Sequence, residues 1–264
     1  MRVLVTGAAS GIGRATCLRL ARDGVERKER ACIAALDVSR DGRLDELVSD
    51  LEAVGASVIT LGADLADSSA IEAAVGEAIS AFDGLDGLVS NAGINHPSRL
   101  LELPIDAWDR LFAVNTRATW LLGKAAHAAL KASNGSIVAT ASMSGSYPHA
   151  NLGAYAPSKA ALIMLVGVMA QEFGADGIRV NAVSPGMVRT GMTEQVYKNN
   201  EVATARGDLV PLGRVANPED IADVIAFLLG PDARYINGHD LVVDGGVTGN
   251  HLGRLPGLTQ ITVG

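Results

Sequence analysis

Short apolar segments rich in β-branched residues alternate along this chain with longer segments whose apolar residues recur at helical spacing. The short segments predict strands at 2–6, 31–36, 57–62, 87–90, 136–141, 178–183 and 241–243. The longer segments predict helices at 12–22, 44–54, 68–82, 106–132, 154–173 and 218–229. Strands that alternate with helices pair in parallel, and continuous apolar strands are buried on both faces. The order therefore predicts a three-layer α/β fold, with a parallel sheet between two layers of helices.

The length of 264 residues suits one large α/β domain or two small ones. No repeat, low-complexity tract or linker interrupts the alternation, so we expect a single domain over 1–264. Residues 187–212 break the pattern with a mixed, polar sequence that contains a weak helical stretch. Because a loop this long is usually functional, we interpret it as a lid over a substrate. The tail at 247–264 has no clear period, and its apolar residues favour packing on a neighbouring subunit over fraying.

Composition excludes several classes of protein. A formal net charge of −7 without a long basic block argues against nucleic acid as a partner. No apolar run approaches the roughly 18 residues of a membrane span, and the first residues lack a signal-peptide core. Two cysteines, Cys17 and Cys32, suit a reducing compartment, so we expect a cytoplasmic protein. The histidines are scattered without metal-ligand spacing, so no metal site is expected.

Three glycines follow the first predicted strand. Gly7, Gly11 and Gly13 have the spacing GxxxGxG and stand where the first predicted helix begins, with Ser10 and Ile12 between them. Glycine lets the backbone turn tightly and approach a pyrophosphate, and a helix N-terminus offers free N–H groups to an anion. The alternative is a tight strand–helix turn without a ligand. The position at the first strand–helix junction favours dinucleotide binding.

Asp37 ends the second predicted strand, 24 residues after Gly13. An acidic residue at this point accepts hydrogen bonds from the adenosine ribose hydroxyls. It also repels a 2′-phosphate. Asp37 therefore favours NAD over NADP as the cofactor.

The distance between Gly13 and Asp37 exceeds the usual offset of about 20 residues. We place the surplus in a charged, solvated loop at 25–30, before the second strand. In the alternative, one of its basic residues folds back and neutralises a 2′-phosphate; these residues are Arg27, Lys28 and Arg30. Ser10 weakens that alternative, because no basic residue stands at its position in the glycine turn.

Further motifs follow in order. They are Asp64-Leu65, Asn91-Ala92-Gly93, Asn115, Ser142, Tyr155-x-x-x-Lys159 and Pro185-Gly186 with Thr190. Each is weak by itself, and their common order and spacing make them specific. From Thr6 to Gly246, which is nearly the whole chain, the sequence resembles the short-chain dehydrogenase/reductase family.

The resemblance implies a Rossmann-type, doubly wound sheet of seven parallel strands and an NAD(P)-dependent oxidoreductase. It also implies a homotetramer that packs through the two long helices. In such a protein Asp64 contacts the adenine, and the Asn91-Ala92-Gly93 backbone lines the adenosine ribose. The expected cofactor-binding residues are Gly7, Ser10, Gly11, Ile12, Gly13, Asp37, Asp64, Leu65, Asn91, Ala92, Gly93, Tyr155 and Lys159, with Pro185, Gly186, Val188 and Thr190 at the nicotinamide end.

Tyr155 and Lys159 are four residues apart on a predicted helix and therefore share a face. A free tyrosine has a pKa of about 10, which is too high for a base at neutral pH. A nearby ammonium and a positive nicotinamide ring favour the phenolate. We expect Tyr155 to act as general base in alcohol oxidation and as general acid in ketone reduction, and Lys159 to lower its pKa and bind the nicotinamide ribose. An exposed pair without function is the alternative for this spacing taken alone.

Ser142 and Asn115 complete the expected catalytic set. Ser142 is expected to hydrogen-bond to the substrate oxygen and position it. Ser144 and Ser146 are rivals, and the spacing to Tyr155 favours Ser142. By resemblance, Asn115 holds a water molecule that links the catalytic lysine to solvent; the alternative is a residue that bends its helix.

Five residues are candidates for contact with the substrate. By the family's geometry, His96, His149 and Asn151 lie near the mouth of the site, where they would hydrogen-bond to a polyol or a keto acid. Met187 and Met192 would belong to an apolar lid. The alternative for each is an ordinary loop residue.

The predicted function is the NAD-dependent interconversion of a secondary alcohol, such as a polyol, sugar alcohol or hydroxy acid, with its ketone. One alternative is an NADPH-dependent ketoreductase of the 3-oxoacyl type, against which Asp37 and Ser10 argue. Another is a regulatory protein that binds NAD without turnover, against which the complete set of Ser142, Tyr155 and Lys159 argues. The substrate cannot be read from the sequence, because one fold and one catalytic set serve many substrates.

Overall fold

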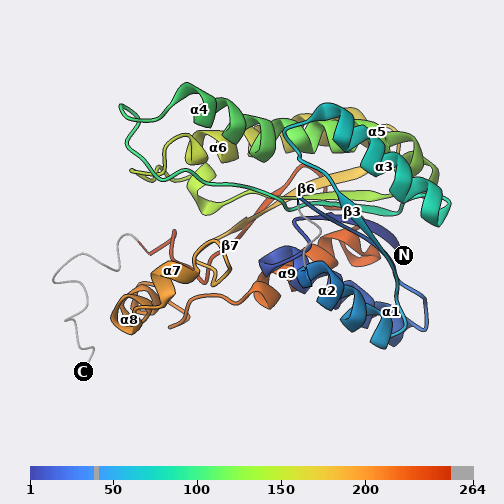
Figure 1. The fold of residues 1–264 in the computed structure, drawn as a ribbon, viewed down its shortest axis with the longest axis horizontal. Helices are drawn as coiled ribbons and strands as arrows, with labels where there is room; N and C mark the ends of the chain where they lie inside the picture. Colours follow the sequence, from blue (N-terminus) through green and yellow to red (C-terminus); the bar gives the residue numbers. More distant parts are fainter. Residues whose placement is uncertain (39–41, 251–264) are drawn as a thin grey trace.

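A seven-stranded parallel sheet forms the centre of the protein (Figure 1). The structure, a computed structural model, describes residues 1–38 and 42–250. The strands are β1 (Arg2–Thr6), β2 (Cys32–Asp37), β3 (Ser57–Gly62), β4 (Gly87–Ser90), β5 (Ser136–Thr140), β6 (Arg179–Pro185) and β7 (Asp240–Val243). Their order is β3-β2-β1-β4-β5-β6-β7, and all neighbours pair in parallel. The strand order reverses beside β1, so the predicted doubly wound, Rossmann-type fold is confirmed.

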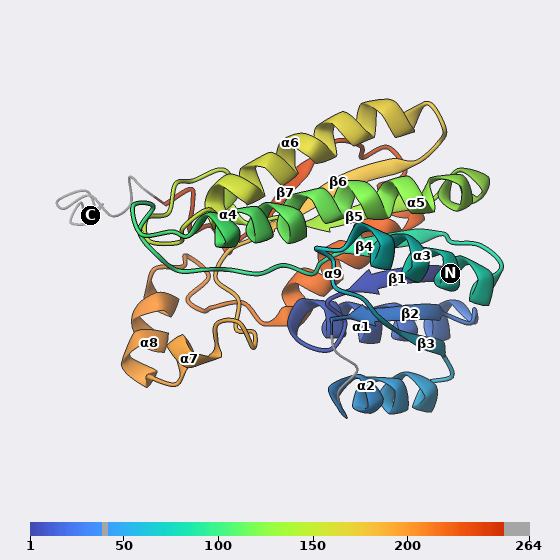
Figure 2. The same cartoon turned by 45° about the horizontal axis from the view of Figure 1, so that its top comes forward.

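Helices cover the sheet on both faces (Figures 1 and 2). One layer contains α1 (Gly11–Arg27), α2 (Gly42–Ala53) and α9 (Pro218–Leu229). The other contains α3 (Ser68–Phe82), α4 (Ile105–Phe112), α5 (Ala118–Ser133) and α6 (Tyr155–Gly174). Each layer packs on its own hydrophobic core. Along β1, Leu4 belongs to one core, and Val3 and Val5 belong to the other, as the alternation of side chains across a strand requires.

Two helices begin where the sequence predicts, because side chains cap their first turns. The Asp67 carboxylate accepts the backbone N–H of Ser69 at 2.9 Å before α3. Before α9, Asp220 reaches back to accept the backbone N–H of Asn217 at 2.8 Å, and Pro218 occupies the first helical position. Such caps satisfy N–H groups that have no partner within the helix.

The charged segment at 25–30 is not a separate loop as predicted. Helix α1 continues to Arg27, and Lys28 ends it in the left-handed conformation with φ of 58°. A helix of 17 residues is about 25 Å long, so Arg27 and Lys28 lie far from the glycine turn at its other end. This placement disfavours the alternative in which Arg27 or Lys28 reaches a 2′-phosphate beside Asp37, and the choice between NAD and NADP stays a prediction.

The helix predicted at 106–132 is interrupted. A π-helical turn, η1 (Ala113–Arg117), separates α4 from α5 and contains Asn115. The Asn115 side chain is hydrogen-bonded to the neighbouring loop and to α6, and these bonds accompany the wider turn. A single π turn inside a helix is frequently found at a functional site.

Residues 187–212 contain more structure than predicted. Two short helices, α7 (Glu194–Tyr197) and α8 (Asn200–Asp208), lie beyond the carboxyl end of β6 (Figure 1). An isolated parallel β-bridge pairs Val188 with Ala216. Two 3-10 turns complete the fold, η2 (Met143–Gly145) after β5 and η3 (Pro231–Ala233) after α9. The apolar residues of the tail, beginning with Leu252, lie outside the described residues. No helix in 1–38 or 42–250 is long and apolar enough to cross a membrane.

Candidate active site

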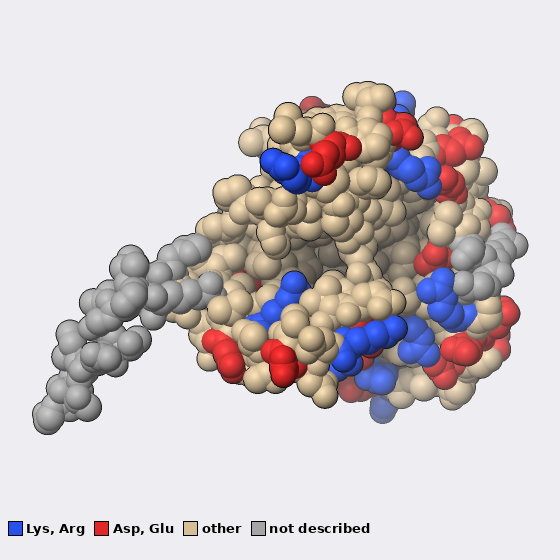
Figure 3. Space-filling view, turned by 60° about the vertical axis from the view of Figure 1, so that its left-hand side comes forward, with Lys and Arg blue, Asp and Glu red and all other residues tan. Residues whose placement is uncertain are grey.

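The carboxyl ends of six strands, β1 to β6, open into one cavity of about 360 Å³. Figure 3 shows the hollow between the two halves of the molecule, with walls that are mainly uncharged. Most of the predicted site residues line it. They are Gly7, Ser10, Gly11, Ile12, Asp37, Asp64, Leu65, Asn91, Ala92, Gly93, Ser142, Tyr155, Lys159, Pro185, Gly186, Val188, Thr190 and Met192.

The glycine turn between β1 and α1 needs its glycines for two different reasons. Gly7 and Gly11 have φ angles of 68° and 54°, in the region that side chains disfavour. Gly13 is required by close packing, because a Cβ atom there would lie 2.1 Å from the carbonyl oxygen of Gly7. Gly13 therefore stands behind the cavity wall and lets α1 approach the strand. The N-terminus of α1 faces the cavity through Gly11 and Ile12.

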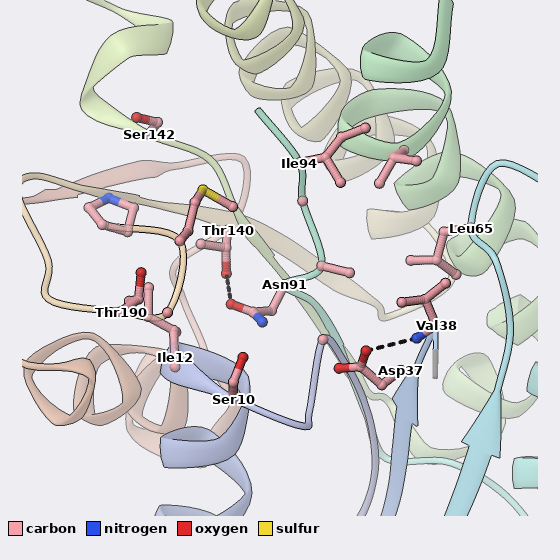
Figure 4. Close-up of a pocket in the computed structure, with 18 of the residues that line it drawn as sticks. Ser10, Ile12, Asp37, Val38, Leu65, Asn91, Ile94, Thr140, Ser142 and Thr190 are labelled. Atoms are coloured by element: carbon pink, nitrogen blue, oxygen red, sulfur yellow. Dashed lines mark hydrogen bonds between the residues drawn. The ribbon is translucent and has the colours of Figure 1, made fainter. Parts of the chain in front are cut away.

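Asp37 is fixed at the end of β2 (Figure 4). One carboxylate oxygen accepts the backbone N–H of Ala9 at 3.0 Å, and the other accepts that of Val38 at 2.8 Å. The carboxylate thus joins the glycine turn to β2 and keeps a constant orientation toward the cavity, where lone pairs remain for further donors.

The ends of β1, β4 and β5 are tied together below the cavity. The Thr6 hydroxyl accepts the backbone N–H groups of Asn91 at 2.9 Å and Ala92 at 3.0 Å. The Asn91 amide donates to the Thr6 carbonyl oxygen at 3.0 Å and accepts from the Thr140 hydroxyl at 3.2 Å (Figure 4). These bonds hold the Asn91-Ala92-Gly93 backbone in place along the floor of the cavity.

Asp64 follows β3 and meets a residue of α4. Its carboxylate accepts the backbone N–H of Ala66 at 2.9 Å and a guanidinium N–H of Arg110 at 3.1 Å. These bonds, with that from Ala66 the largest cause, lower the pKa of Asp64. Asp64 therefore presents an ionised carboxylate to the cavity.

Ser142 ends the segment after β5 and is buried. Its hydroxyl oxygen accepts the backbone N–H of Ser144 at 3.1 Å. That bond uses a lone pair of the oxygen and leaves the O–H free to donate. Ser142 is thus oriented as a hydrogen-bond donor toward Tyr155 and the cavity.

Tyr155 begins α6, one turn before Lys159. Burial raises the pKa of the Tyr155 phenol, and a hydrogen bond with Ser142 counteracts part of this rise. The Lys159 ammonium lies 5.9 Å from the centre of the phenol ring. The lowered pKa that we expected depends on the lysine together with a positive nicotinamide ring, so it stays a prediction.

Lys159 is buried and donates a hydrogen bond to the Thr140 carbonyl oxygen at 2.7 Å. Burial lowers the pKa of the Lys159 ammonium from 10.5 to about 8. The group is therefore mostly protonated at neutral pH and remains within reach of deprotonation.

Asn115 lies behind the cavity wall, where all its donors are used. Its amide group donates to the Ile94 carbonyl oxygen at 2.9 Å and to the Ser158 hydroxyl at 3.0 Å. Its oxygen accepts the backbone N–H of Ile94 at 2.8 Å. One acceptor position on that oxygen remains for a further donor. Gly93 lies between this oxygen and Lys159, since a Cβ atom on Gly93 would be 3.3 Å from the one and 3.4 Å from the ammonium.

The segment after β6 forms the wall opposite Tyr155. Gly186 leaves no room for a side chain, because a Cβ atom there would lie 2.7 Å from the Asp244 Cα atom. The Thr193 hydroxyl accepts the backbone N–H of Thr190 at 3.0 Å and donates to the Val188 carbonyl oxygen at 2.7 Å. These bonds shape the turn that carries Thr190 and Met192 into the cavity.

Four of the predicted substrate residues do not line the cavity. His96, His149 and Asn151 are exposed, and Met187 is partly buried. The His149 ring nitrogen Nδ1 lies 3.4 Å from the hydroxyl of Ser144.

Sequence reasoning missed several residues of the wall. They are Leu36, Val38, Ala63, Ile94, Arg110, Val114, Thr140, Ala141, Gly191 and Thr193. Most are neighbours in sequence of a predicted site residue at the carboxyl end of a strand, and this position could have indicated them. Arg110 and Val114 come from a helix, and their spacing of four residues was the available indication that they share a face.

Comparison with known proteins identifies the family. The family model described as enoyl-(acyl carrier protein) reductase matches residues 7–248. The chain is 36% identical over 246 residues to the 3-oxoacyl-(acyl-carrier-protein) reductase FabG of Thermotoga maritima, covering 92% of this chain and 96% of that protein. It is 34% identical over 244 residues to the 2,5-dichloro-2,5-cyclohexadiene-1,4-diol dehydrogenase LinX of Sphingobium indicum, covering 92% and 94%.

A solved structure agrees with these relatives. A short-chain dehydrogenase from Burkholderia cenocepacia J2315 in complex with NADP superposes with a TM-score of 0.85 at 37% identity, covering 94% of this chain and 97% of that one. The chain therefore belongs to the short-chain dehydrogenase/reductase family. It is an NAD(P)-dependent oxidoreductase of the alcohol dehydrogenase and ketoreductase type, acting on secondary alcohols or ketones.

Proposed function

We propose that the protein interconverts a secondary alcohol and its ketone with NAD as cofactor. One observation carries this proposal: Ser142, Tyr155 and Lys159 meet at one end of a cavity whose other end holds the glycine turn and Asp37. The residues present fit a dinucleotide, because Gly7 and Gly11 line the cavity without a side chain, and the N-terminus of α1 faces it with N–H groups for a pyrophosphate. A bound nicotinamide accepts or supplies the hydride of such a reaction.

Four side chains of the site transfer protons or position the substrate and the cofactor. Tyr155 exchanges the proton of the substrate oxygen, as acid in reduction and as base in oxidation. The Ser142 O–H, which the Ser144 N–H leaves free to donate, holds that oxygen in place. Lys159 supplies a positive charge beside the phenol and donors to the nicotinamide ribose. Asn115 offers its remaining acceptor position to a water molecule that passes protons between Lys159 and solvent.

Replacement of Tyr155 by phenylalanine tests this mechanism. Turnover of any alcohol or ketone is expected to fall by at least about 100-fold, because the proton of the substrate oxygen loses its acid and base. NAD binding, measured by calorimetry, is expected to stay within about twofold of wild type. The matched control is Tyr235→Phe, which removes the same hydroxyl from a fully exposed residue. Unchanged turnover in the Tyr155 variant would refute the assignment.

The preference for NAD rests on Asp37. Its carboxylate is held by two backbone N–H groups at the end of β2, where we expect the adenosine ribose to bind, so a 2′-phosphate would meet a fixed negative charge. Side-by-side titration with NAD and NADP is expected to give tighter binding of NAD. Asp37→Asn is expected to bring the Kd values for NAD and NADP closer together, because it removes the charge that repels a 2′-phosphate. Tighter binding of NADP by the wild-type protein would overturn the preference.

A second candidate is NADPH-dependent reduction of a 3-oxoacyl thioester. The name of the Thermotoga relative and the NADP bound to the Burkholderia protein favour it. A polyol, a sugar alcohol and a hydroxy acid, each assayed with NAD, should be compared with a 3-oxoacyl thioester assayed with NADPH. The larger kcat/KM decides between the two functions.

We also propose a homotetramer assembled through the long helices α5 and α6. These helices expose Trp120, Met164 and Val168, which are apolar side chains that association would cover. Sedimentation equilibrium is expected to give four times the chain mass, and a monomer would exclude this assembly.

A further inference from the structure

Arg110 and Asp64 form an ion pair in the wall of the cavity. The Nη2 atom of Arg110 lies 3.1 Å from one carboxylate oxygen of Asp64 and 3.4 Å from the other. Asp64 comes from the turn after β3, and Arg110 comes from the last turn of α4, so the pair joins two elements that are distant in sequence. Both side chains line the cavity.

The ion pair contributes little to the stability of the fold. The Arg110 and Asp64 side chains are 51% and 42% exposed, and exposed ion pairs stabilise proteins by about 0–1 kcal/mol. This small contribution to stability does not account for a charged group in the cavity wall, which also includes the apolar residues Val38, Leu65 and Val114.

The surroundings of Arg110 suit a flat, aromatic group. Apolar residues that follow β2 and β3 and one residue of the η1 turn line the same cavity, as a purine ring would require. The carboxylate of Asp64 holds the planar guanidinium at the rim. A guanidinium fixed in this way has a face available to an aromatic ring and further N–H donors for its edge.

Resting on the function proposed above, we infer that Arg110 determines the affinity for the adenine end of the cofactor, with its guanidinium packed on the base and Asp64 held beside it. In this role Arg110 is a recognition residue of the cofactor site, remote from the reacting atoms. A lysine would keep the charge, but it would lose the flat surface and the fork of donors.

Arg117 is a matched control on the same helical segment. Its guanidinium donates to the Ala66 carbonyl oxygen at 2.7 Å and therefore holds the same turn that Asp64 belongs to. Arg117 does not line the cavity. Removing it loosens the turn without removing a group that a base could touch.

Calorimetric titration with ADP-ribose, which carries the adenine end without nicotinamide, tests the inference on the full chain. Arg110→Gln and Arg110→Lys are each expected to raise the Kd about tenfold, and Arg117→Gln is expected to leave it within twofold. Circular dichroism and thermal unfolding confirm that all variants fold. A second titration with nicotinamide mononucleotide, which lacks the adenine, is expected to give the same Kd for every variant.

Three results would overturn the inference. Arg110→Gln binding ADP-ribose like wild type would show no contact with the base. Arg110→Lys behaving like wild type would reduce the role to general attraction of a negative ligand. Arg117→Gln losing as much affinity as Arg110→Gln would assign the effect to the turn. Failure of the wild-type protein to bind either NAD or ADP-ribose would instead refute the proposed function, and the inference with it.

Discussion

Replacing Lys159 with methionine is expected to change how the stability of the protein depends on pH. Burial lowers the pKa of this lysine in the folded protein from 10.5 to about 8. Between these two pH values the unfolded chain carries a proton that the folded chain has released. The free energy of unfolding of the wild-type protein therefore rises with pH across this window, by about 3 kcal/mol in total. The methionine variant has no such proton, so its curve lacks this rise.

Urea unfolding at pH 7 to 10.5 measures this difference. Other groups titrate equally in both proteins, so the difference between the two free energies of unfolding, plotted against pH, reports Lys159. The lost hydrogen bond to Thr140 shifts this difference by a constant and does not change its slope. Lys198→Met, at an exposed position, is the control and is expected to follow the wild-type curve. Turnover of the Lys159 variant is expected to fall by at least about 100-fold at every pH. Parallel curves of the free energy of unfolding against pH for the wild type and the Lys159 variant would refute the reasoning that burying this ammonium destabilises the folded protein.

Two glycines offer further tests of the site. Gly93→Ala places a Cβ atom between Asn115 and Lys159, 3.3 Å and 3.4 Å from their polar atoms, where a bridging water would lie. Its kcat is expected to fall about tenfold at nearly unchanged thermal stability, and an unchanged kcat would contradict the water relay. Gly13→Ala brings a Cβ atom to 2.1 Å from a backbone oxygen, so a loss of about 1–3 kcal/mol of stability and weaker NAD binding are expected in thermal unfolding with and without NAD. Gly76→Ala, where a Cβ atom meets nothing within 4 Å, is the control and is expected to stabilise its helix.

The fold could be predicted because the alternation of strands and helices is a local property of the sequence. Strands at 57–62 and 87–90 and the helix at 218–229 have the predicted bounds, since capping residues and apolar periods mark their ends. The π turn around Asn115 could not be predicted. Its sequence, Ala-Val-Asn-Thr-Arg, is compatible with a regular helix, and the bonds to Ile94 and Ser158 that accompany the wider turn come from distant parts of the chain.

The candidate site could be predicted where its residues stand at the ends of strands. Asp37 and Ser142 follow apolar runs whose direction in a parallel sheet places them at one edge. Arg110 stands on a helix whose sequence does not show which face meets the cavity. His96 and His149 stand in loops without a period, so no local pattern indicated that they lie outside the cavity wall.

The protonation state of Tyr155 matches what ketone reduction needs more closely than what alcohol oxidation needs. A free tyrosine already keeps its proton at neutral pH, and burial raises the pKa of Tyr155 further, so the phenol is in the protonated form that ketone reduction requires. Alcohol oxidation needs the phenolate, which desolvation of the phenol disfavours. A positive charge near the hydroxyl favours the phenolate and so helps Tyr155 to work as a base. Such a charge arrives with an oxidised nicotinamide, so oxidation is expected to require that the cofactor binds before the alcohol, whereas Tyr155 is already poised to donate its proton in reduction.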